Sequence, residues 1–391
     1  MQISDRLLRK FRATSFRIEE SLFSINRRTC APEEHAGGLI DWILRAQQFA
    51  GSGGVPEGYE CISRTWLAPY PETTGYIICS LLRATRLNQI SVAILQSAAV
   101  RMGDWLVGLQ SPEGGFFGGN TQVPVRQLSV FNTGQVLKGF TDLVAAGLDP
   151  EGTFRNAAAR AARWMIGQQE ADGSWRRGVS VLTSEPVHTY YVRAAWPLAR
   201  YGKQCGNDAA VNAALKNAEW VLSLQGDDDW FPHMNFDRGE TPHTHTVAYT
   251  IQGLLEIGVL CDRPDLVATV ERCAHRVRAL QDPANGFLPG RIAEGYKTAA
   301  DWSCTSANSQ MAIVWFRLAQ ITGDTSWLGA AKRAVAFNSS IQDIRHRDPG
   351  RRGGIRSAFP GHRGYCCYKY TNWAQKFFLD ALMAQLGIAP V

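Results

Sequence analysis

The chain has 391 residues, of which 45% are hydrophobic and 19% charged, which is typical of a globular protein rather than a disordered or fibrous one. The formal net charge is +6, but basic and acidic residues are interspersed, so the composition weakly favours an anionic ligand and does not indicate a nucleic-acid-binding protein. The N-terminal segment lacks the apolar core of a secretion signal, and no stretch offers about 18 uninterrupted apolar residues. With nine scattered cysteines and no disulfide pattern, we expect a cytoplasmic protein without a membrane span.

Residues 1–36 precede the first copy of a repeated unit, and we expect them to form an arm packed on the rest of the chain. From there on, apolar helical runs end at a glutamine about every 60 residues, a period that indicates a repeat architecture. The glutamines are Gln47, Gln110, Gln169, Gln225, Gln281 and Gln342. Five places earlier stand Trp42, Trp105, Trp164, Trp220, Arg276 and Phe337, so five of the six copies carry a large aromatic residue there.

Each copy contains two kinds of helical run. The first kind ends at the glutamine, mixes charged and apolar residues as an outer helix does, and covers 39–48, 94–110, 154–169, 208–225, 264–281 and 327–342. The second kind carries fewer charges, as expected of inner helices, and covers 72–84, 130–146, 188–202, 244–258, 304–323 and 370–387. Because each pair buries its apolar face only against its neighbours, we predict an all-α fold: an (α/α)6 toroid of six inner and six outer helices, forming one domain over residues 37–391.

The repeat unit resembles that of a known superfamily. The sequence QEADGSW at 169–175 is similar to the QW-type repeat of the squalene cyclase and protein prenyltransferase toroids. Within the repeats, WLAPYPETTGYIICSLL, SCTSANSQMAIVWFRLAQITGD and SAFPGHRGYCCYKYTNWAQKFFLDAL resemble bacterial exopolysaccharide-biosynthesis proteins that carry this toroid. The resemblance implies a polysaccharide partner, free or lipid-linked, and association with a polysaccharide synthesis complex.

Loops that enter the inner helices of such a barrel converge on one mouth, where helix N-termini favour anions. At the first entrance, Trp66, Tyr70, Glu72 and Tyr76 surround a proline turn. Glu72 is either a helix-stabilising acid of the first turn or a general acid or base flanked by aromatic residues that stack on sugars.

The third and fourth entrances are rich in histidine. His188, Tyr190 and Arg193 fall within one and a half helical turns, so a substrate carboxylate held by arginine near a proton donor is geometrically feasible, although a lone histidine is as often buried and structural. His233, His243 and His245 precede or begin the fourth inner helix, where the HxH pair is only a weak metal signal.

The fifth and sixth entrances add an aromatic and basic cluster that suits sugar faces and acidic groups, or that plugs the end of the barrel. Its members are Asp301, Trp302, Cys304, His362, Tyr365, Tyr368, Lys369, Asn372 and Trp373.

These residues suggest an enzyme acting on an acidic, uronate-containing glycan by removing the proton at C5, as an epimerase or a lyase does. Such a site must neutralise the carboxylate and supply an acid and a base of tuned pKa. Arg193, Lys369 or His362 are candidates for the first task. For the second we expect Tyr70, Glu72, His188, Tyr190 and His245, without a metal or cofactor.

Three alternatives remain open at this stage. A glycoside hydrolase needs two carboxylates, such as Glu72 with Asp301 or with an acid of GDDDW at 226–230. A zinc-dependent prenyltransferase-like site would use Asp301, Cys304 and His362, although their spacing departs from that pattern; GDDDW likewise departs from the DxDD motif of terpene cyclases. The third alternative is a non-catalytic glycan-binding scaffold.

Overall fold

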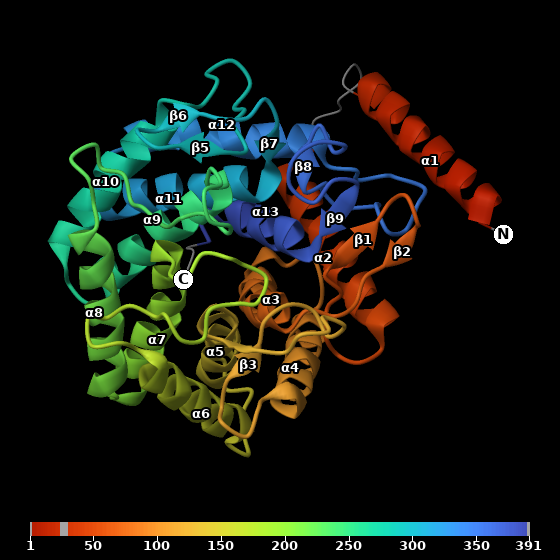
Figure 1. Ribbon diagram of the computed structural model, residues 1–391. Coiled ribbons are helices and arrows are strands. Elements are labelled where there is room, and N and C mark those ends of the chain that lie inside the picture. Colours follow the sequence, from red (N-terminus) through yellow and green to blue (C-terminus); the bar gives the residue numbers. More distant parts are fainter. Residues whose placement is uncertain (1, 24–29, 389–391) are drawn as a thin grey trace.

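The computed structural model describes residues 2–23 and 30–388, which form a ring of paired helices with one additional helix outside it (Figure 1). The outer helices are α2 (Pro32–Ala50), α4 (Val92–Leu109), α6 (Thr153–Gln168), α8 (Asp208–Ser223), α10 (Pro264–Arg278) and α12 (Ser326–Ile341). The inner helices are α3 (Pro71–Ala84), α5 (Val130–Ala145), α7 (Val192–Cys205), α9 (Thr244–Leu260), α11 (Thr305–Thr322) and α13 (Asn372–Gln385). Each inner helix contacts the next, and α13 returns to α3. The predicted (α/α)6 toroid is therefore confirmed.

The repeated glutamine is a joint between consecutive outer helices. In the first copy, Gln47 Nε2 donates to the carbonyl of Gly53 in the following turn at 2.8 Å and to that of Ala98 in α4 at 3.0 Å. In the last copy, Gln342 Nε2 donates to Gly353 at 2.7 Å and to His35 of α2 at 3.0 Å. The last outer helix is thereby bonded to the first, and the same bond that links neighbours also closes the ring.

The turn after each glutamine needs a residue with positive φ. Gly173 has φ +93°, and a Cβ there would lie 2.4 Å from the carbonyl oxygen of Lys216 in the next outer helix, so only glycine fits. The fourth copy places Asp229 in this position, with φ +66°. Its carboxylate pairs with Arg272 at 2.8 Å and Arg276 at 3.4 Å on α10. Arg276, the one exception to the aromatic pattern, thus compensates for a turn that lacks glycine.

Long loops connect each outer helix to its inner partner, and all of them gather at one end of the barrel, which we call the mouth. Short strands pair these loops in four sheets. One sheet orders β2 (Thr65–Trp66), β1 (Gly58–Glu60) and β9 (Lys369–Thr371), with Tyr59 opposite Tyr370, so the first and last loops join across the closure. The others pair β3 (Phe116–Phe117) with β4 (Leu128–Ser129), β5 (Ile292–Ala293) with β6 (Lys297–Thr298), and β7 (Ser303–Cys304) with β8 (Ala358–Phe359).

The N-terminal arm is shorter than predicted. Helix α1 (Gln2–Phe23) lies outside the ring, whereas α2 already begins at Pro32, so the boundary predicted at residue 36 falls inside the first outer helix. Pro32 at the first helical position and Glu33 and Glu34 in the first turn are ordinary helix-start signals. Of the described helices, α4 is long and apolar enough to cross a membrane by length and composition alone; it packs against α3, α5 and α6 as the second outer helix.

Candidate active site

A cavity of about 310 Å³ opens at the mouth, above the N-termini of the inner helices. Nine of its twenty lining residues are Phe, Tyr or Trp, and five of the six loops that enter inner helices, or the helices they enter, contribute to it. The lining residues are Glu57, Tyr70, Glu72, Thr73, Tyr76, Gly119, Asn120, Val123, Phe131, Asn132, Ser180, Leu182, Thr183, Tyr190, Tyr191, Phe236, His245, Tyr249, Tyr365 and Trp373. A pocket of this size, in which aromatic rings alternate with polar side chains, suits a small ligand or the end of a longer one.

Glu72 is one of two carboxyl groups that line this cavity. Pro71 starts α3, so the next residue falls in the first turn and its side chain is only 8% exposed. Burial raises the pKa of Glu72 to about 7, and a hydrogen bond with Tyr70 opposes part of that rise. A helix N-terminus favours the charged form by about 1 kcal/mol at most, so desolvation outweighs it. Near neutral pH this carboxyl group can both donate and accept a proton.

Glu57 is a second carboxylate in the same cavity, and the sequence analysis did not identify it. Its Oε1 accepts from Lys369 Nζ at 3.2 Å and its Oε2 from Asn120 Nδ2 at 2.8 Å. The charges of both Glu72 and Glu57 raise the pKa of Tyr70, after burial itself, so the Tyr70 hydroxyl lies near both carboxylates. Glu57 stands in an irregular loop rather than at a helix start, and no motif marks it.

The tyrosine hydroxyl groups of the cavity are proton donors. Burial, followed by the charges of neighbouring groups, raises the pKa of Tyr76, Tyr190 and Tyr365 well above the ordinary tyrosine value. Tyr249, on the cavity side of α9, has its pKa raised for the same first reason. All four therefore stay protonated and can donate hydrogen bonds to sugar oxygens.

Three histidines in or behind the cavity lining, His188, His243 and His245, have lowered pKa values and are neutral near pH 7. His245 lines the cavity, burial lowers its pKa well below the ordinary value, and neither ring nitrogen has a hydrogen-bond partner within the described part of the chain. Burial also lowers the pKa of His243 to about 3 and that of His188 to about 4. His188 Nε2 lies 3.1 Å from the Thr183 hydroxyl, and His243 Nε2 lies 3.3 Å from Arg291. Of these three histidines, His245 is the one that lines the cavity, so its ring edge can meet a ligand there.

The structure brings part of the predicted site together. The predicted residues that line the cavity are Tyr70, Glu72, Tyr76, Tyr190, His245, Tyr365 and Trp373. His188 and His243 lie directly behind this lining, with ring centroids 4.5 Å from Tyr190 and 4.9 Å from Tyr365 respectively.

The three residues expected to neutralise a substrate carboxylate lie elsewhere. Arg193 is 1% exposed beneath the floor, with its guanidinium carbon 5.5 Å from the centre of the Tyr249 ring. Lys369 pairs with Glu57, and His362 pairs with Glu20 of α1 at 2.9 Å. Among the described residues that line the cavity there is no lysine or arginine. The cation expected from the sequence is therefore missing from this surface.

Other predicted ligand-binding residues have structural partners outside the cavity. Trp66 packs against Trp42, with ring centroids 5.0 Å apart, and Tyr368 packs against Phe16 of α1 at 5.3 Å. His233 pairs with Glu185 at 2.9 Å.

Two further predicted residues hold the rim together. Asn372 Nδ2 donates to the carbonyl of Pro56 at 2.8 Å and to the Thr73 hydroxyl at 2.7 Å. Trp302 lies against Gly290 and Gly364, where any Cβ would meet the indole ring.

The residues of the zinc alternative do not converge. Asp301 is exposed and pairs with Arg363 at 2.5 Å, Cys304 is buried at the start of α11, and His362 faces α1. Within residues 2–23 and 30–388, no group of three or more His, Cys, Asp or Glu side chains is placed to hold a metal ion.

The second entrance was also overlooked. Phe131 and Asn132, in the first turn of α5, both line the cavity. The Asn132 amide nitrogen is buried without a hydrogen-bond partner among the described residues, so it is available to a ligand. Its position at the start of an inner helix is the same signal that identified Glu72, and applying that signal to every entrance would have found it.

Comparisons with known proteins bear on the fold. No protein-family model matches the chain, and no curated protein matches it in sequence. Among solved structures, an unsaturated glucuronyl hydrolase from Bacillus sp. GL1 superimposes with a TM-score of 0.67 at 17% identity, covering 90% of this chain and 96% of its own. A D-mannose isomerase gives 0.70 at 12% identity, covering 91% and 97%. A GH76 α-mannanase from Bacteroides thetaiotaomicron gives 0.66 at 11% identity, covering 92% and 98%.

These neighbours share the (α/α)6 barrel with this chain over nearly their whole length, and all three are named as enzymes that act on carbohydrates. At such low identity the likeness shows the fold. The comparisons therefore support the toroid fold that the resemblance to exopolysaccharide-biosynthesis proteins implied. They do not support a biosynthetic role.

Proposed function

We propose that the chain is a carbohydrate-active enzyme that hydrolyses a glycosidic bond at the mouth of its barrel. One observation carries the proposal: two carboxyl groups, Glu72 and Glu57, share one aromatic cavity and have different surroundings. Hydrolysis of a glycoside uses a protonated carboxylic acid and an ionised carboxylate on either side of the bond. Burial keeps Glu72 partly protonated near pH 7, whereas Lys369 pairs with Glu57 as a carboxylate.

The roles follow from this difference. Glu72 donates its proton to the glycosidic oxygen as the bond to the anomeric carbon breaks. Glu57 removes a proton from the water molecule whose oxygen forms the new bond to that carbon. Aromatic rings such as Tyr190 and Trp373 contact sugar faces, while the Asn132 amide and the His245 ring edge hydrogen-bond hydroxyl groups.

Proton abstraction at C5 of a uronate, by an epimerase or a lyase, is the second candidate. Glu72 with a pKa of about 7 is a suitable base, and the buried tyrosines are suitable acids. Several structural neighbours are named as unsaturated glucuronyl hydrolases, which act on uronates. The cavity supports this candidate less well, because a uronate carboxylate would meet Glu57 and no lining cation. A cytoplasmic role in polysaccharide synthesis, with a free or lipid-linked glycan, belongs to the proposal under either reaction.

The test is incubation of the purified chain with neutral and uronate-containing oligosaccharides in deuterated water, followed by mass spectrometry and NMR. Shorter products with new reducing ends and no deuterium at C5 support hydrolysis. Deuterium at C5 supports epimerisation, and ultraviolet absorbance from an unsaturated sugar supports elimination; either result overturns the hydrolase proposal. Binding without turnover would instead support a glycan-binding scaffold.

Glu57→Gln and Glu72→Gln should each lower the rate of product formation by at least about 100-fold, and Glu113→Gln, at an exposed loop position, is the matched control. Equal activity in all three variants would contradict the assignment of this cavity as the active site.

A further inference from the structure

Helix α1 docks on the barrel through its polar face. Glu20 pairs with Arg356 at 2.8 Å and with His362 at 2.9 Å, and Glu19 pairs with Arg351 at 2.7 Å. Farther along the helix, Arg12 donates to backbone carbonyls of the first mouth loop. Amphipathic helices of globular proteins usually bury their apolar stripe and expose their polar one. Of the large apolar side chains that the structure describes in α1, only Phe16, which is 4% exposed and packs against Tyr368, is buried in the docking face, and the others lie on the opposite side of the helix.

The apolar face of α1 consequently faces solvent. Leu7 is 62% exposed, Phe11 71%, Ile18 56% and Leu22 64%, and Leu8 next to them is 44% exposed. The spacing of three or four residues, or multiples of it, places these side chains on one side of the helix. Of the eleven large apolar side chains that are exposed in the described structure, five lie on this one helix. A contiguous patch of this kind marks an interaction surface.

The free half of α1 is basic. Arg6 and Lys10 are exposed on the flank of the Leu7 and Phe11 stripe, Arg9 is exposed on the other side of the helix, and the acids Glu19 and Glu20 are occupied by arginines of the barrel. The last mouth loop, on which α1 rests, adds the exposed Arg347 and Arg352, whereas its exposed Arg345 and Arg363 pair with Glu34 and Asp301. The unpartnered apolar face therefore lies within a region of positive charge.

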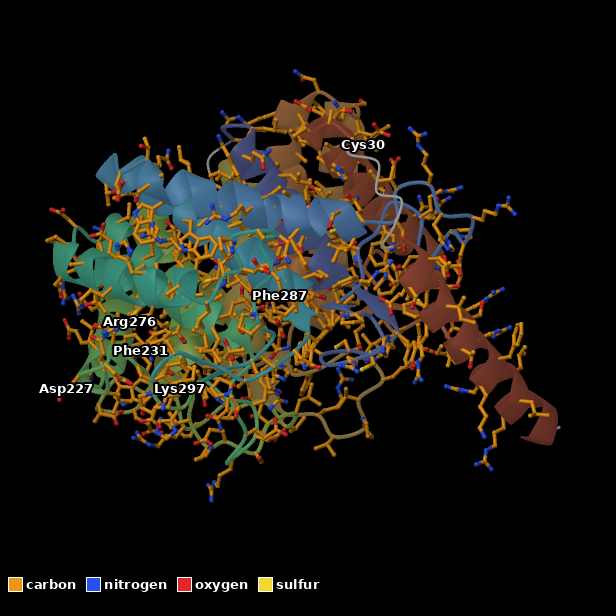
Figure 2. The ribbon with its side chains drawn as sticks, turned by 90° about the horizontal axis from the view of Figure 1, so that it is seen from above. Cys30, Asp227, Phe231, Arg276, Phe287 and Lys297 are labelled. Atoms are coloured by element: carbon orange, nitrogen blue, oxygen red, sulfur yellow. The ribbon has the colours of Figure 1, made fainter. Side chains whose placement is uncertain are left out.

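Helix α1 lies at the mouth. Its contacts are with the loop at 61–63 and with the loop that ends at β9, both of which enter inner helices that line the cavity. Figure 2 shows the end of α1 away from Cys30 standing clear of the barrel at the lower right, across the molecule from Asp227 and Lys297 of two other mouth loops at the lower left. Two further mouth loops, between α4 and α5 and between α6 and α7, expose Val125 (62%) and Leu182 (51%). The mouth end therefore carries exposed apolar side chains beyond those of α1.

We propose that α1 binds the surface of a lipid bilayer that contains anionic lipid, with its apolar face in the interface and its cations at the headgroups. A helix with this pattern partitions into such an interface, and each cation near an anionic surface strengthens binding about fivefold. A second copy of the chain, packed on the same stripe, would instead bring Arg6 and Lys10 close to like charges, which opposes pairing. The bilayer complements both the apolar stripe and the charge. The proposal is independent of the reaction, but it places the cavity close to substrates held at a membrane surface.

The experiment is sedimentation of the full chain with vesicles of phosphatidylcholine, and of phosphatidylcholine mixed with phosphatidylglycerol. We expect binding to the mixed vesicles that weakens with added salt. Phe11→Glu should lower the partition coefficient by at least about tenfold, because burying a phenylalanine contributes about 2 kcal/mol. Lys10→Gln should lower it about fivefold. Ile94→Glu, at a 52% exposed position in the first turn of α4 at the opposite end of the barrel, is the matched control and should bind like the unaltered chain.

Three results would overturn the proposal: no binding to the mixed vesicles, equal loss in Phe11→Glu and Ile94→Glu, or no loss in either. A change from dimer to monomer on Phe11→Glu in light scattering, without vesicle binding, would assign the face to a second copy and likewise overturn it. Far-ultraviolet circular dichroism and urea unfolding check that each variant is folded, and because Phe11 is exposed we expect no change in either.

Discussion

Glu72 holds the position on which the proposed chemistry depends, since its proton is available near pH 7. We predict that Glu72→Gln lowers kcat by about 10²-fold to 10⁴-fold, the usual contribution of a positioned general acid or base. In the unaltered enzyme, the rate should fall as pH rises through about 7, because the acid loses its proton. The measurement is a pH–rate profile with the oligosaccharide that proves to be turned over. A variant that keeps its rate, or an unaltered enzyme without a limb near pH 7, would remove Glu72 from catalysis.

The same residue has a predicted cost in stability. The pKa of Glu72 is about 7 in the folded chain and near 4.5 in the unfolded one, so between these pH values the folded state binds more protons. The free energy of unfolding therefore falls as pH rises from about 4.5 to 7, by about 3 kcal/mol from this group. Glu72→Gln should remove that dependence and be more stable than the unaltered chain at pH 8, with the difference vanishing near pH 4. Urea unfolding at both pH values measures it, and a difference independent of pH would contradict the assigned environment.

Single residues show where sequence reasoning succeeds and where it fails. Glu72, Tyr190 and His245 were predicted because they stand at or near inner-helix starts, and the closed ring brings those starts to one cavity. Glu57 was missed because it stands in a loop, and only the β1–β9 pairing across the ring brings it to Lys369. Arg193 was misplaced because a 3-10 turn, Thr189–Tyr191, precedes α7, and the helical position alone did not show that its side chain lies beneath the floor.

At the scale of secondary structure elements, the joints between outer helices should carry much of the stability. We predict that Gln47→Ala lowers the free energy of unfolding by about 2 to 3 kcal/mol, because two backbone carbonyls lose their donor in a buried setting. Gln48 is the adjacent residue and is exposed, so Gln48→Ala should change stability by less than about 0.5 kcal/mol. Urea unfolding of both variants is the measurement. If the two variants lost equal stability, the joint would not be the reason for the repeated glutamine.

Two glycines that lie six residues apart, Gly167 and Gly173, should change stability in opposite directions when replaced by alanine. Gly173→Ala forces a Cβ to within 2.4 Å of the Lys216 carbonyl at a φ of +93°, so we expect a loss of more than about 2 kcal/mol. Gly167 lies near the end of α6 with nothing within 4 Å of an added Cβ, and Gly167→Ala should raise stability by about 0.5 to 1 kcal/mol through helix propensity. Thermal unfolding of the pair tests the turn geometry; a loss in both variants would indicate that helix packing, rather than backbone conformation, sets the preference.

The repeat pattern predicted the elements better than their limits. A glutamine after an outer run and a glycine in the next turn both serve one joint, so the period is visible in the sequence wherever that joint exists. The barrel was predicted to begin at residue 37, five residues after α2 begins at Pro32. The first turn of α2 precedes the apolar run that served as the marker. The small strands at the mouth were not expected, since strands of two or three residues are too short to show an alternating pattern.

For the molecule as a whole, Gln342 joins the last outer helix, α12, to the first, α2, in the same way as Gln47 joins α2 to α4. Gln342 Oε1 accepts from the His35 ring Nδ1 at 2.6 Å, and Gln342 Nε2 donates to the backbone carbonyls of His35 and Gly353. The β1–β9 pairing crosses the same gap at the mouth. An open helical array frays from its terminal repeats, because each of those has only one neighbour. In a closed ring no repeat is terminal, and the cavity depends on this because Glu57 and Lys369 come from opposite ends of the sequence.

This closure makes a prediction that an open array does not. Gln342→Ala should lower the free energy of global unfolding by about 2 to 3 kcal/mol, as much as Gln47→Ala. Both substitutions remove the equivalent pair of side-chain amide bonds from one cooperative ring. Urea transitions followed by tryptophan fluorescence and by circular dichroism should shift together. If Gln342→Ala instead produced an early transition confined to the first and last helices, with the remainder unfolding at its original midpoint, the chain would behave as an open array whose ends merely touch.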